Sequence, residues 1–418
     1  MESSKKVPKL SGKKSVFGWV MLTSLLTDEW NIFLIPQTNL FVQTIYRLSG
    51  LELGIVTGIV IFGAAIGSLI GGLLTDLYGR KKVFQIDMSL FIFTAIFSFL
   101  SPDLFLLLIS RFIAGIVVGA DIANVFSYIM ENAESGEREY LGSLGPLIAS
   151  FSILSINGLV LILLYLKESA AIIWGSSLIL SSVPAIASLL LSVRIGESTQ
   201  WKLIAHKRVS FISMFQNIAL KDKMRRTSIY SYISGAATTI EVGTFAFFIP
   251  FIVSKTGIFN EIEVRLVVLA VYSVGVPAGI LGAKIVSKIG FRMISCIGYA
   301  ITFFSLFSSA ILLIFRFYYL VPITMMLFVW GNHWNSQPII PSQALVSNTE
   351  FRGKSIGTTN FISELPAFLS ISIFPSFVTQ FGLGVSTMVI CIAPVMGLLV
   401  SIFIFKEVYG FRSDLSLP

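Results

Sequence analysis

Six ionisable side chains interrupt the long apolar segments of this sequence: Asp28, Arg111, Asp121, Glu241, His333 and Glu364. Charged groups are costly at membrane depth, and those that are retained there usually bind ions, protons or ligands. Four of the six are carboxylic acids and only one is an arginine. This excess of acid is compatible with the transfer of protons, and with a solute that is cationic, zwitterionic or uncharged.

A second candidate for chemistry is the unbroken polar and aromatic run that begins at Trp330 and ends at Gln337. Helical spacing places Trp330, His333 and Trp334 on one face. Aromatic rings beside amides that form hydrogen bonds are suited to binding an organic solute. We therefore expect substrate contacts from these three residues and from Asn31, Asn124, Glu241, Asn332, Asn335, Asn360 and Glu364.

No residue pattern predicts a metal site, a cofactor or catalysis. The only histidines are His206 and His333, and Cys296 and Cys391 both lie in apolar stretches. The nucleotide-binding pattern G-x-x-x-x-G-K-[ST] is absent. We therefore expect a protein that is not an enzyme, binds no metal or cofactor, and takes its energy from an ion gradient.

The composition restricts the class of protein that can carry these residues. Of 418 residues, 55% are hydrophobic and only 12% are charged, and the mean hydropathy is +0.86. A soluble domain carries about 25% charged residues, so a soluble fold of this size could not cover its surface. Because the apolar residues run through the whole chain, we expect an all-α protein of the cell membrane with many spans.

Twelve segments of the sequence are long and apolar enough to cross the bilayer as helices, which takes about 20 residues each. The predicted spans are residues 16–42, 53–75, 83–100, 104–131, 140–166, 170–192, 228–254, 264–287, 292–315, 319–343, 355–379 and 384–405. A long polar and basic stretch separates the sixth span from the seventh. We therefore divide the chain into a tail (1–15), a first six-helix bundle (16–192), a linker (193–227), a second six-helix bundle (228–405) and a second tail (406–418).

The distribution of basic residues predicts the orientation in the membrane. If both termini are cytoplasmic, 24 of the 30 Lys and Arg residues lie in cytoplasmic segments and five lie outside. Such a bias is typical of cytoplasmic loops. The net charge of +8 then indicates contact with anionic lipid and not with nucleic acid. We expect a monomer whose partners are the lipid bilayer, protons and a small-molecule substrate.

The two halves of the sequence repeat one another. Gly79 and Gly290 stand in similar loops at an offset of 211 residues, and Glu131 and Gln343 end the fourth and tenth spans at an offset of 212. Two independent features at nearly one offset indicate a duplicated six-helix unit. Parallel repeats of this kind are typical of membrane transporters.

The segment from Gly72 to Lys81 fits the pattern G-x-L-x-D-x-x-G-R-K at every defined position. In this respect the chain resembles the major facilitator superfamily, which implies two six-helix bundles around a central cavity. The residues that we expect to form a gate are Gly72, Asp76, Gly79, Arg80 and Lys81. The alternative is that this segment forms only a rigid turn.

Other positions resemble the branch of this superfamily that holds sugar porters, phosphate and aromatic-acid proton symporters, and organic-ion transporters. Residues 111–121 resemble R-F-x-x-G-x-x-x-G-G-D, and residues 196–201 resemble P-E-S-P-R-W without its two Pro and its Arg. Residues 341–353 resemble P-x-E-x-x-P-T-x-x-R-G, with Gln343 in place of Glu. Residues 28–31 resemble D-G-Y-D, with Asn31 in place of the second Asp.

The resemblance implies that an acid of the first span and an arginine of the fourth span form a proton-sensitive pair. Because position 31 is an Asn, we expect Asp28 to pair with Arg111, the only strongly basic group at membrane depth. Protonation of Asp28 would break the pair and release one conformation. The candidates for proton coupling are Asp28, Arg111, Asp121 and Glu241.

Two further acids are expected to have structural roles only. Glu29 points about 100° away from Asp28 on a helix, so we expect it at a contact between helices. Asp87 lies near the end of the third span, so we expect it in solvent or paired with a loop.

The sequence therefore favours a proton-coupled symporter that moves a small polar organic solute by alternating access. The solute would be a sugar, an organic acid or a related metabolite, with phosphate as a further option. The alternative is a drug or organic-cation/proton antiporter. A membrane enzyme or a receptor is the third class, and the sequence offers neither a catalytic set nor a signalling domain for it.

Overall fold

The computed structural model of the chain describes residues 13–101, 103–133, 137–204 and 210–411. Every regular element in these residues is helical, which confirms the all-α prediction. Parts of the two predicted tails and of the linker, with His206, lie outside the described residues.

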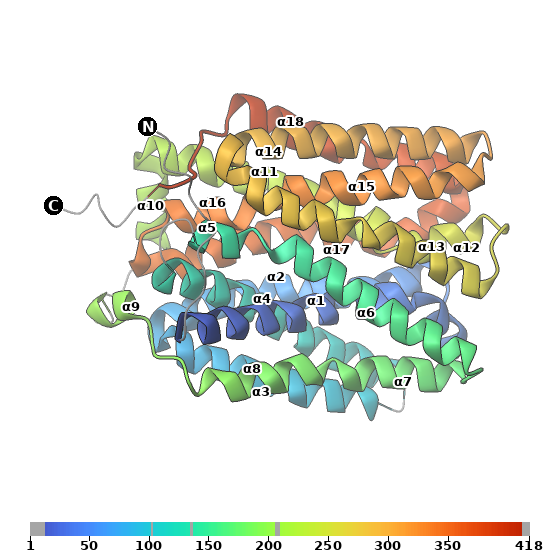
Figure 1. Ribbon diagram of the computed structural model, residues 1–418, viewed down its shortest axis with the longest axis horizontal. Coiled ribbons are helices and arrows are strands. Elements are labelled where there is room, and N and C mark those ends of the chain that lie inside the picture. Colours follow the sequence, from blue (N-terminus) through green and yellow to red (C-terminus); the bar gives the residue numbers. More distant parts are fainter. Residues whose placement is uncertain (1–12, 102, 134–136, 205–209, 412–418) are drawn as a thin grey trace.

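The described residues of the first half of the chain form eight helices. They are α1 (Lys13–Tyr46), α2 (Gly50–Tyr78), α3 (Arg80–Phe99), α4 (Leu104–Asn132), α5 (Glu137–Gly142), α6 (Gly145–Tyr165), α7 (Ala170–Leu180) and α8 (Ser182–Ser192). Two short helices follow in the linker, α9 (Thr199–Ile204) and α10 (Phe211–Leu220). Most of the longer helices run along the long axis of the molecule (Figure 1).

The second half begins with α11 (Asp222–Glu241), the π-helical turn η1 (Val242–Ala246) and α12 (Ile249–Lys255). The remaining elements are α13 (Glu261–Ser273), α14 (Gly275–Ile314), η2 (Tyr318–Leu320), α15 (Val321–Ser336), α16 (Ile339–Val346), η3 (Thr349–Phe351), α17 (Arg352–Ile390) and α18 (Ile392–Phe403). Helices α9 and α10 lie at one end of the molecule and α12 lies at the other (Figure 1). We call these ends the α9 end and the α12 end.

Proline explains where several predicted spans are interrupted. A proline has no N–H to donate to the carbonyl group four residues before it. Helices end four residues before a proline in four places: at Leu180 before Pro184, at Ala246 before Pro250, at Ser273 before Pro277 and at Ile390 before Pro394. Spans that the sequence predicts as continuous helices are therefore pairs of shorter helices in the structure.

Eight helical stretches of the described residues are long and apolar enough to cross a membrane. Two of them, Glu261–Ile314 and Thr349–Phe403, have 54 and 55 residues, far more than the about 20 that one crossing needs. Each of these two contains a sharp bend, at Gly290 and at Gly382 respectively. The count of twelve spans and the cytoplasmic position of the termini stay predictions.

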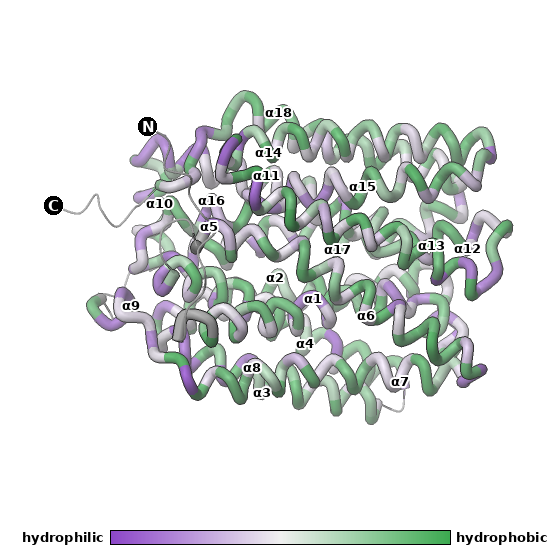
Figure 2. Tube along the Cα trace, in the orientation of Figure 1, coloured by the Kyte–Doolittle hydropathy of each residue, from purple (hydrophilic) through white to green (hydrophobic). Residues whose placement is uncertain are grey.

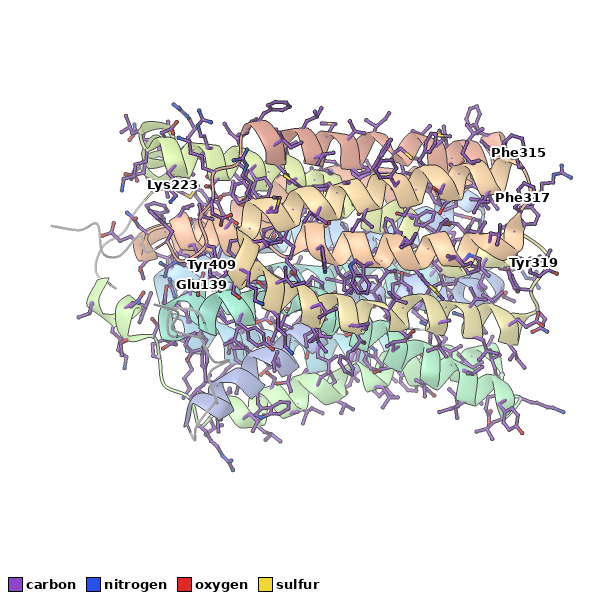
Figure 3. All side chains as sticks on the ribbon, turned by 45° about the horizontal axis from the view of Figure 1, so that its top comes forward. Glu139, Lys223, Phe315, Phe317, Tyr319 and Tyr409 are labelled. Atoms are coloured by element: carbon purple, nitrogen blue, oxygen red, sulfur yellow. The ribbon has the colours of Figure 1, made fainter. Side chains whose placement is uncertain are left out.

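The surface agrees with a protein that crosses a bilayer. Hydrophobic residues dominate the middle of the helices, and hydrophilic residues gather at the two ends (Figure 2). Phe315, Phe317 and Tyr319 are exposed together at one end, whereas Lys223 lies at the α9 end (Figure 3). Exposed aromatic rings near helix ends are typical of the membrane interface.

The predicted duplication is visible in the backbone. Gly79 has φ 96° and Gly290 has φ 82°, a region that side chains with a Cβ rarely adopt. After Gly79, the carboxylate of Glu197 accepts a hydrogen bond from the N–H of Arg80 at 3.0 Å. After Gly290, Glu407 accepts from the N–H of Phe291 at 3.0 Å. The same glycine bend, held by a carboxylate from a distant segment, therefore occurs once in each half.

Helix α2 links the two halves because it packs closely on both sides. One of its faces lies against α4 and the other lies against α17 of the second half. The hydroxyl of Ser68 on α2 donates to the carbonyl oxygen of Gly357 on α17 at 2.9 Å. Small residues at these contacts let the helix backbones approach each other, as is common in membranes.

We predict that Gly119→Ala lowers the thermal stability of the detergent-solubilised protein. An added Cβ at Gly119 of α4 would overlap the carbonyl oxygen of Ala64 on α2, and overpacking of this kind costs about 1–3 kcal/mol. The control is Gly158→Ala on α6, where a Cβ meets nothing within 4 Å. Equal melting temperatures of the two variants would contradict the close approach of α2 and α4.

Candidate functional site

A cavity of about 240 Å³ lies between the two halves of the chain. Its walls come from both halves, with α1, α4 and α6 on one side and η1, α15 and α17 on the other. Most of the lining side chains are apolar, among them Phe33, Phe126, Phe247 and Phe328. Ligand sites usually combine such apolar walls with a few polar groups that orient the ligand.

Five of the predicted site residues line this cavity: Asp28, Asn332, His333, Asn360 and Glu364. They come from α1, α15 and α17, so both halves contribute. The structure adds Glu29, which the sequence assigned to a contact between helices. That assignment was wrong because α1 turns two adjacent acids, Asp28 and Glu29, toward the same cavity.

The predicted ion pair between Asp28 and Arg111 is absent in this conformation. Arg111 binds Asn31 instead, through Nη1 to the side-chain oxygen at 3.0 Å and through Nη2 to the backbone carbonyl oxygen at 2.6 Å. Both carboxylate oxygens of Asp28 are buried, and the side-chain hydrogen-bond partner of this carboxyl group is the carboxyl group of Asp121 on α4. The pairing prediction failed because Asn31, almost one helical turn further along α1, is the residue that faces the guanidinium group.

Asp28 has acids as its charged neighbours. Asp121 of α4, Glu29 of α1 and Asp87 of α3 lie within electrostatic range of its carboxyl group. Asp121 accepts a hydrogen bond from the hydroxyl of Ser24. Asp87 is 4% exposed, so the prediction that it lies in solvent is wrong. An acid that is buried among acids is costly to keep ionised, which makes proton binding at this site favourable.

Glu241 lies behind the cavity wall and does not line the cavity. Its Oε2 atom accepts hydrogen bonds from Asn335 at 3.0 Å and from Asn332 at 3.3 Å. It is the last residue of α11, directly before the π-helical turn η1. Turns of this kind often mark functional sites. Both Asn332 and Asn335 bind Glu241, but of these two predicted site residues only Asn332 also lines the cavity.

The two tryptophans of α15 also lie outside the cavity. Their ring centroids are 5.8 Å apart, and the indole N–H of Trp334 donates to the carbonyl oxygen of Ala278 on α14 at 3.0 Å. The prediction that Trp330 and Trp334 contact the solute is therefore not met in this conformation. The phenylalanine rings of the cavity were missed because apolar residues on buried helices carry no distinguishing pattern.

Asn124 contacts the predicted gating motif and does not line the cavity. Its side-chain amide donates to the backbone carbonyl oxygen of Arg80 at 3.0 Å. The predicted contact between Asn124 and the substrate is therefore not met in this conformation. The side chain instead holds the loop between α2 and α3.

The predicted gating motif joins the two halves at the α9 end. Asp76 at the end of α2 accepts hydrogen bonds from the backbone N–H groups of Gly353 and Lys354, at 3.2 and 3.1 Å. It also forms ion pairs with Lys354 Nζ at 3.2 Å and with Arg80 at 3.3 Å. Because Lys354 lies in the first turn of α17, the carboxylate also faces the positive end of that helix.

Glu131 extends this network. Its carboxylate binds Arg80 through two hydrogen bonds, at 2.6 and 2.9 Å, and binds Arg352 of α17 at 3.3 Å. The hydroxyl of Ser198 donates to the same carboxylate at 2.5 Å. In the remainder of the motif, Gly79 forms the bend and Lys81 takes part through its backbone N–H, which donates to Glu197. Gly72 lies against the backbone of Gly353. These contacts favour the gate over the rigid turn.

A buried arginine joins the two halves toward the α12 end. Arg265 of α13 is 0% exposed. Its Nη1 donates to the backbone carbonyl oxygen of Gln37 on α1 at 2.5 Å and to the side-chain oxygen of Asn157 on α6 at 3.2 Å. The guanidinium carbon lies 5.1 Å from the ring centroid of Phe41. Sequence reasoning counted Arg265 among the five basic residues outside the membrane, because it stands at the edge of the predicted span 264–287.

We predict that Asp76→Asn opens the α9 end more often, because it removes the charge that holds Lys354. The rate at which a thiol reagent labels a cysteine at Ile340, a cavity residue of α16, measures this opening after Cys296 and Cys391 are changed to Ser. Breaking buried ion pairs costs about 3–5 kcal/mol, so we expect a large rise in the labelling rate.

Asp103→Asn is the matched control for this experiment. Asp103 is exposed and caps α4 through a hydrogen bond to the N–H of Leu106 at 2.9 Å, which an Asn can also accept. If the Asp76 and Asp103 variants label equally fast, the contact between Asp76 and α17 does not hold the halves together.

We predict that Arg265→Gln opens the α12 end. The change removes the charged donor that bridges α13 to α1 and α6, and each such hydrogen bond contributes about 1.5–3 kcal/mol. A cysteine at Ile61, a cavity residue of α2, should then react faster with a membrane-impermeant thiol reagent. Arg194→Gln, at an exposed position, should leave the rate unchanged. An unchanged rate in Arg265→Gln would show that the arginine does not hold this end closed.

Comparisons with known proteins agree with this architecture. A model of the family described as "Sugar (and other) transporter" matches residues 25–217. The chain is 32% identical to the arabinose-proton symporter of Bacillus subtilis (strain 168) over 173 residues, which cover 40% of this chain and 37% of that protein. It is 36% identical to the D-xylose transporter of Levilactobacillus brevis over 115 residues, which cover 28% of this chain and 25% of that protein. The matched segments thus span well under half the length of these curated relatives.

The likeness in three dimensions extends over nearly the whole chain. The major facilitator superfamily proton:xylose symporter XylE, bound to 6-bromo-6-deoxy-D-glucose, superposes with a TM-score of 0.76. The superposition covers 95% of this chain and 97% of that chain at 19% sequence identity. At this level of identity the likeness establishes the fold.

Proposed function

We propose that this chain, which has the major facilitator fold and resembles sugar porters over its N-terminal half, is a proton-coupled secondary transporter. The observation that carries the proposal is the cavity between the two halves, with the carboxyl group of Asp28 on its wall and no cation paired to it among the described residues. The solute is a small polar organic compound, a sugar or a related metabolite, and it moves together with protons. Relatives named as an arabinose-proton symporter and a D-xylose transporter support this choice.

The transport cycle rests on the polar contacts at the two ends of the interface. The network of Asp76 and Glu131 closes the α9 end, and Arg265 closes the α12 end. Alternating access requires one of these contacts to break while the other persists. When the contacts at both ends are formed, the solute is enclosed between the two halves.

Proton coupling is assigned to Asp28. Its carboxyl group lies on the wall of the solute cavity and is not neutralised by Arg111, which binds Asn31. A carboxylate in this setting is expensive to bury, so the halves close around it at low cost only when it carries a proton. Asp121 serves as the neighbouring proton acceptor, because its carboxyl group shares a side-chain hydrogen bond with that of Asp28.

The protein acts in the cell membrane as a monomer, with both termini in the cytoplasm and the α9 end facing inward. The basic residues of the predicted cytoplasmic loops support this orientation. The first bundle (16–192) and the second bundle (228–405) are the bodies that move relative to each other, and the linker (193–227) connects them.

An organic-cation/proton antiporter is the second candidate, because Glu29 and Glu364 both line the cavity. The two functions differ in the direction of proton flow. Addition of solute to one side of proteoliposomes takes protons along in a symporter and releases them from the other side in an antiporter.

We predict that Asp28→Asn abolishes accumulation of solute against its gradient but preserves solute exchange. A gradient of about one pH unit, coupled to one proton, sustains about a tenfold accumulation. The variant should reach only equal concentrations in proteoliposomes, because it has no proton to carry at this position. Glu168→Gln, at an exposed position, is the control and should accumulate solute normally. Accumulation by Asp28→Asn at the level of the unmodified protein would overturn the assignment.

A further inference from the structure

We infer that the solute of the central cavity carries a protonated amino group, which binds between Glu29 and Glu364. The inference rests on the proposed transport function and specifies the class of its substrate. Glu29 lies on α1 of the first half and Glu364 lies on α17 of the second half. Both line the cavity, and their carboxyl groups are within electrostatic range of each other.

The cavity holds no cation that could neutralise these two acids. None of the described residues that line it is a lysine or an arginine. The buried cations elsewhere are engaged: Arg111 binds Asn31, Arg265 binds Gln37, and Lys354 binds Asp76. Two ionised acids within electrostatic range of each other repel, so both are costly to keep charged until a ligand cation lies between them.

Polar groups beside the two acids point to a bound organic molecule. Asn360 lines the cavity one helical turn before Glu364, is 7% exposed, and its side-chain N–H₂ has no partner. His333 also lines the cavity at 6% exposure, but its ring is held by the hydroxyl of Ser150 at 2.7 Å from Nε2 and by the backbone of Val329 and Pro146. Unpartnered buried polar groups are costly, so they indicate sites where a ligand supplies the missing hydrogen bonds.

An ammonium group fits this arrangement better than a metal ion does. Among the described residues, no group of three or more His, Cys, Asp or Glu side chains is placed to hold a metal. An ammonium group has three N–H donors, enough to reach carboxylates on two sides. The free side-chain N–H₂ of Asn360 suits a hydroxyl group on the same molecule. The substrate class is therefore a small polyhydroxylated amine, such as an amino sugar.

Binding between the two halves gives the ammonium group a mechanical role. Because one acid comes from each half, the cation attracts both and favours closure around the solute. A neutral sugar of the same shape would leave the two carboxylates facing each other. The cavity therefore distinguishes an amine from the corresponding alcohol by its charge and not by its size.

The test measures binding of matched pairs to the purified full-length protein in detergent. D-Glucosamine is compared with D-glucose and with N-acetyl-D-glucosamine, and 2-amino-2-(hydroxymethyl)propane-1,3-diol is compared with pentaerythritol. We expect the amine of at least one pair to bind about tenfold or more tightly than its neutral counterparts, as charge-assisted hydrogen bonds allow. The preference should disappear in Glu29→Gln and in Glu364→Gln, and it should persist in Glu168→Gln.

Three results would overturn the inference: equal or tighter binding of the neutral compounds, no binding of any amine, or a preference that survives in both glutamine variants. The melting temperature without ligand shows whether each variant is folded. Proton-driven uptake is measured separately, so the two proposals can fail separately. If neutral sugars accumulate and no amine preference exists, the transport proposal stands and the amine site falls. If amines bind but nothing accumulates, the site stands and the coupled transport falls.

Discussion

Glu131 holds the structure together because one buried carboxylate binds an arginine from each half. Arg80 belongs to the first half and Arg352 to the second, and all three side chains are almost fully buried. A buried carboxylate without its partners would cost several kcal/mol, so the three groups are stable only as a set. The contacts of Asp76 at the α9 end extend this one, since Arg80 also binds Asp76, which in turn binds Lys354. The relative position of the two halves, and therefore the shape of the cavity, depends on this chain of charges.

The two ends of the interface are closed by different chemistry. At the α9 end, arginine and lysine face carboxylates, and the pairs are buried. At the α12 end, Arg265 faces a backbone carbonyl oxygen and an amide oxygen, and its Nε and Nη2 atoms have no partner. Removing one partner of a buried ion pair costs about 3–5 kcal/mol, whereas a hydrogen bond from a charged donor contributes about 1.5–3 kcal/mol. The α12 end is therefore the one that opens more easily from this conformation.

The sequence predicted the fold well because the fold depends on features that are local and repeated. Apolar length predicted the helices, the spacing of Gly79 and Gly290 predicted the duplication, and the motif at Gly72–Lys81 predicted contacts between the halves. Four helix ends precede a proline by four residues, but Pro36, Pro366 and Pro375 lie inside continuous helices, so proline alone does not predict the interruptions.

The site was predicted only in part because it depends on helix rotation and on the partner that each group finds. Asp28 and Arg111 lie on neighbouring helices, yet Arg111 binds Asn31, which stands three positions after Asp28 on α1. Glu29 was set aside as a neighbour of Asp28, although both acids reach the cavity. Trp330 and Trp334 share a face of α15, but that face lies against α14. The neighbouring helices decide which face of a buried helix borders a cavity. In a membrane helix the pattern of apolar residues does not show which face this is.

The acids of the cavity divide into two groups with different surroundings, and this division makes coupling possible. Asp28 is fully buried, and Asp121 and Asp87 of the first half lie near it, so its charge is balanced most simply by a proton. Glu29 and Glu364 come from opposite halves and border open space, so a solute can lie between them. Because Asp28 and Glu29 are adjacent on α1, a charge that arrives at one changes the field at the other. In the proposed cycle, proton and solute are linked through one turn of α1, without any contact between them.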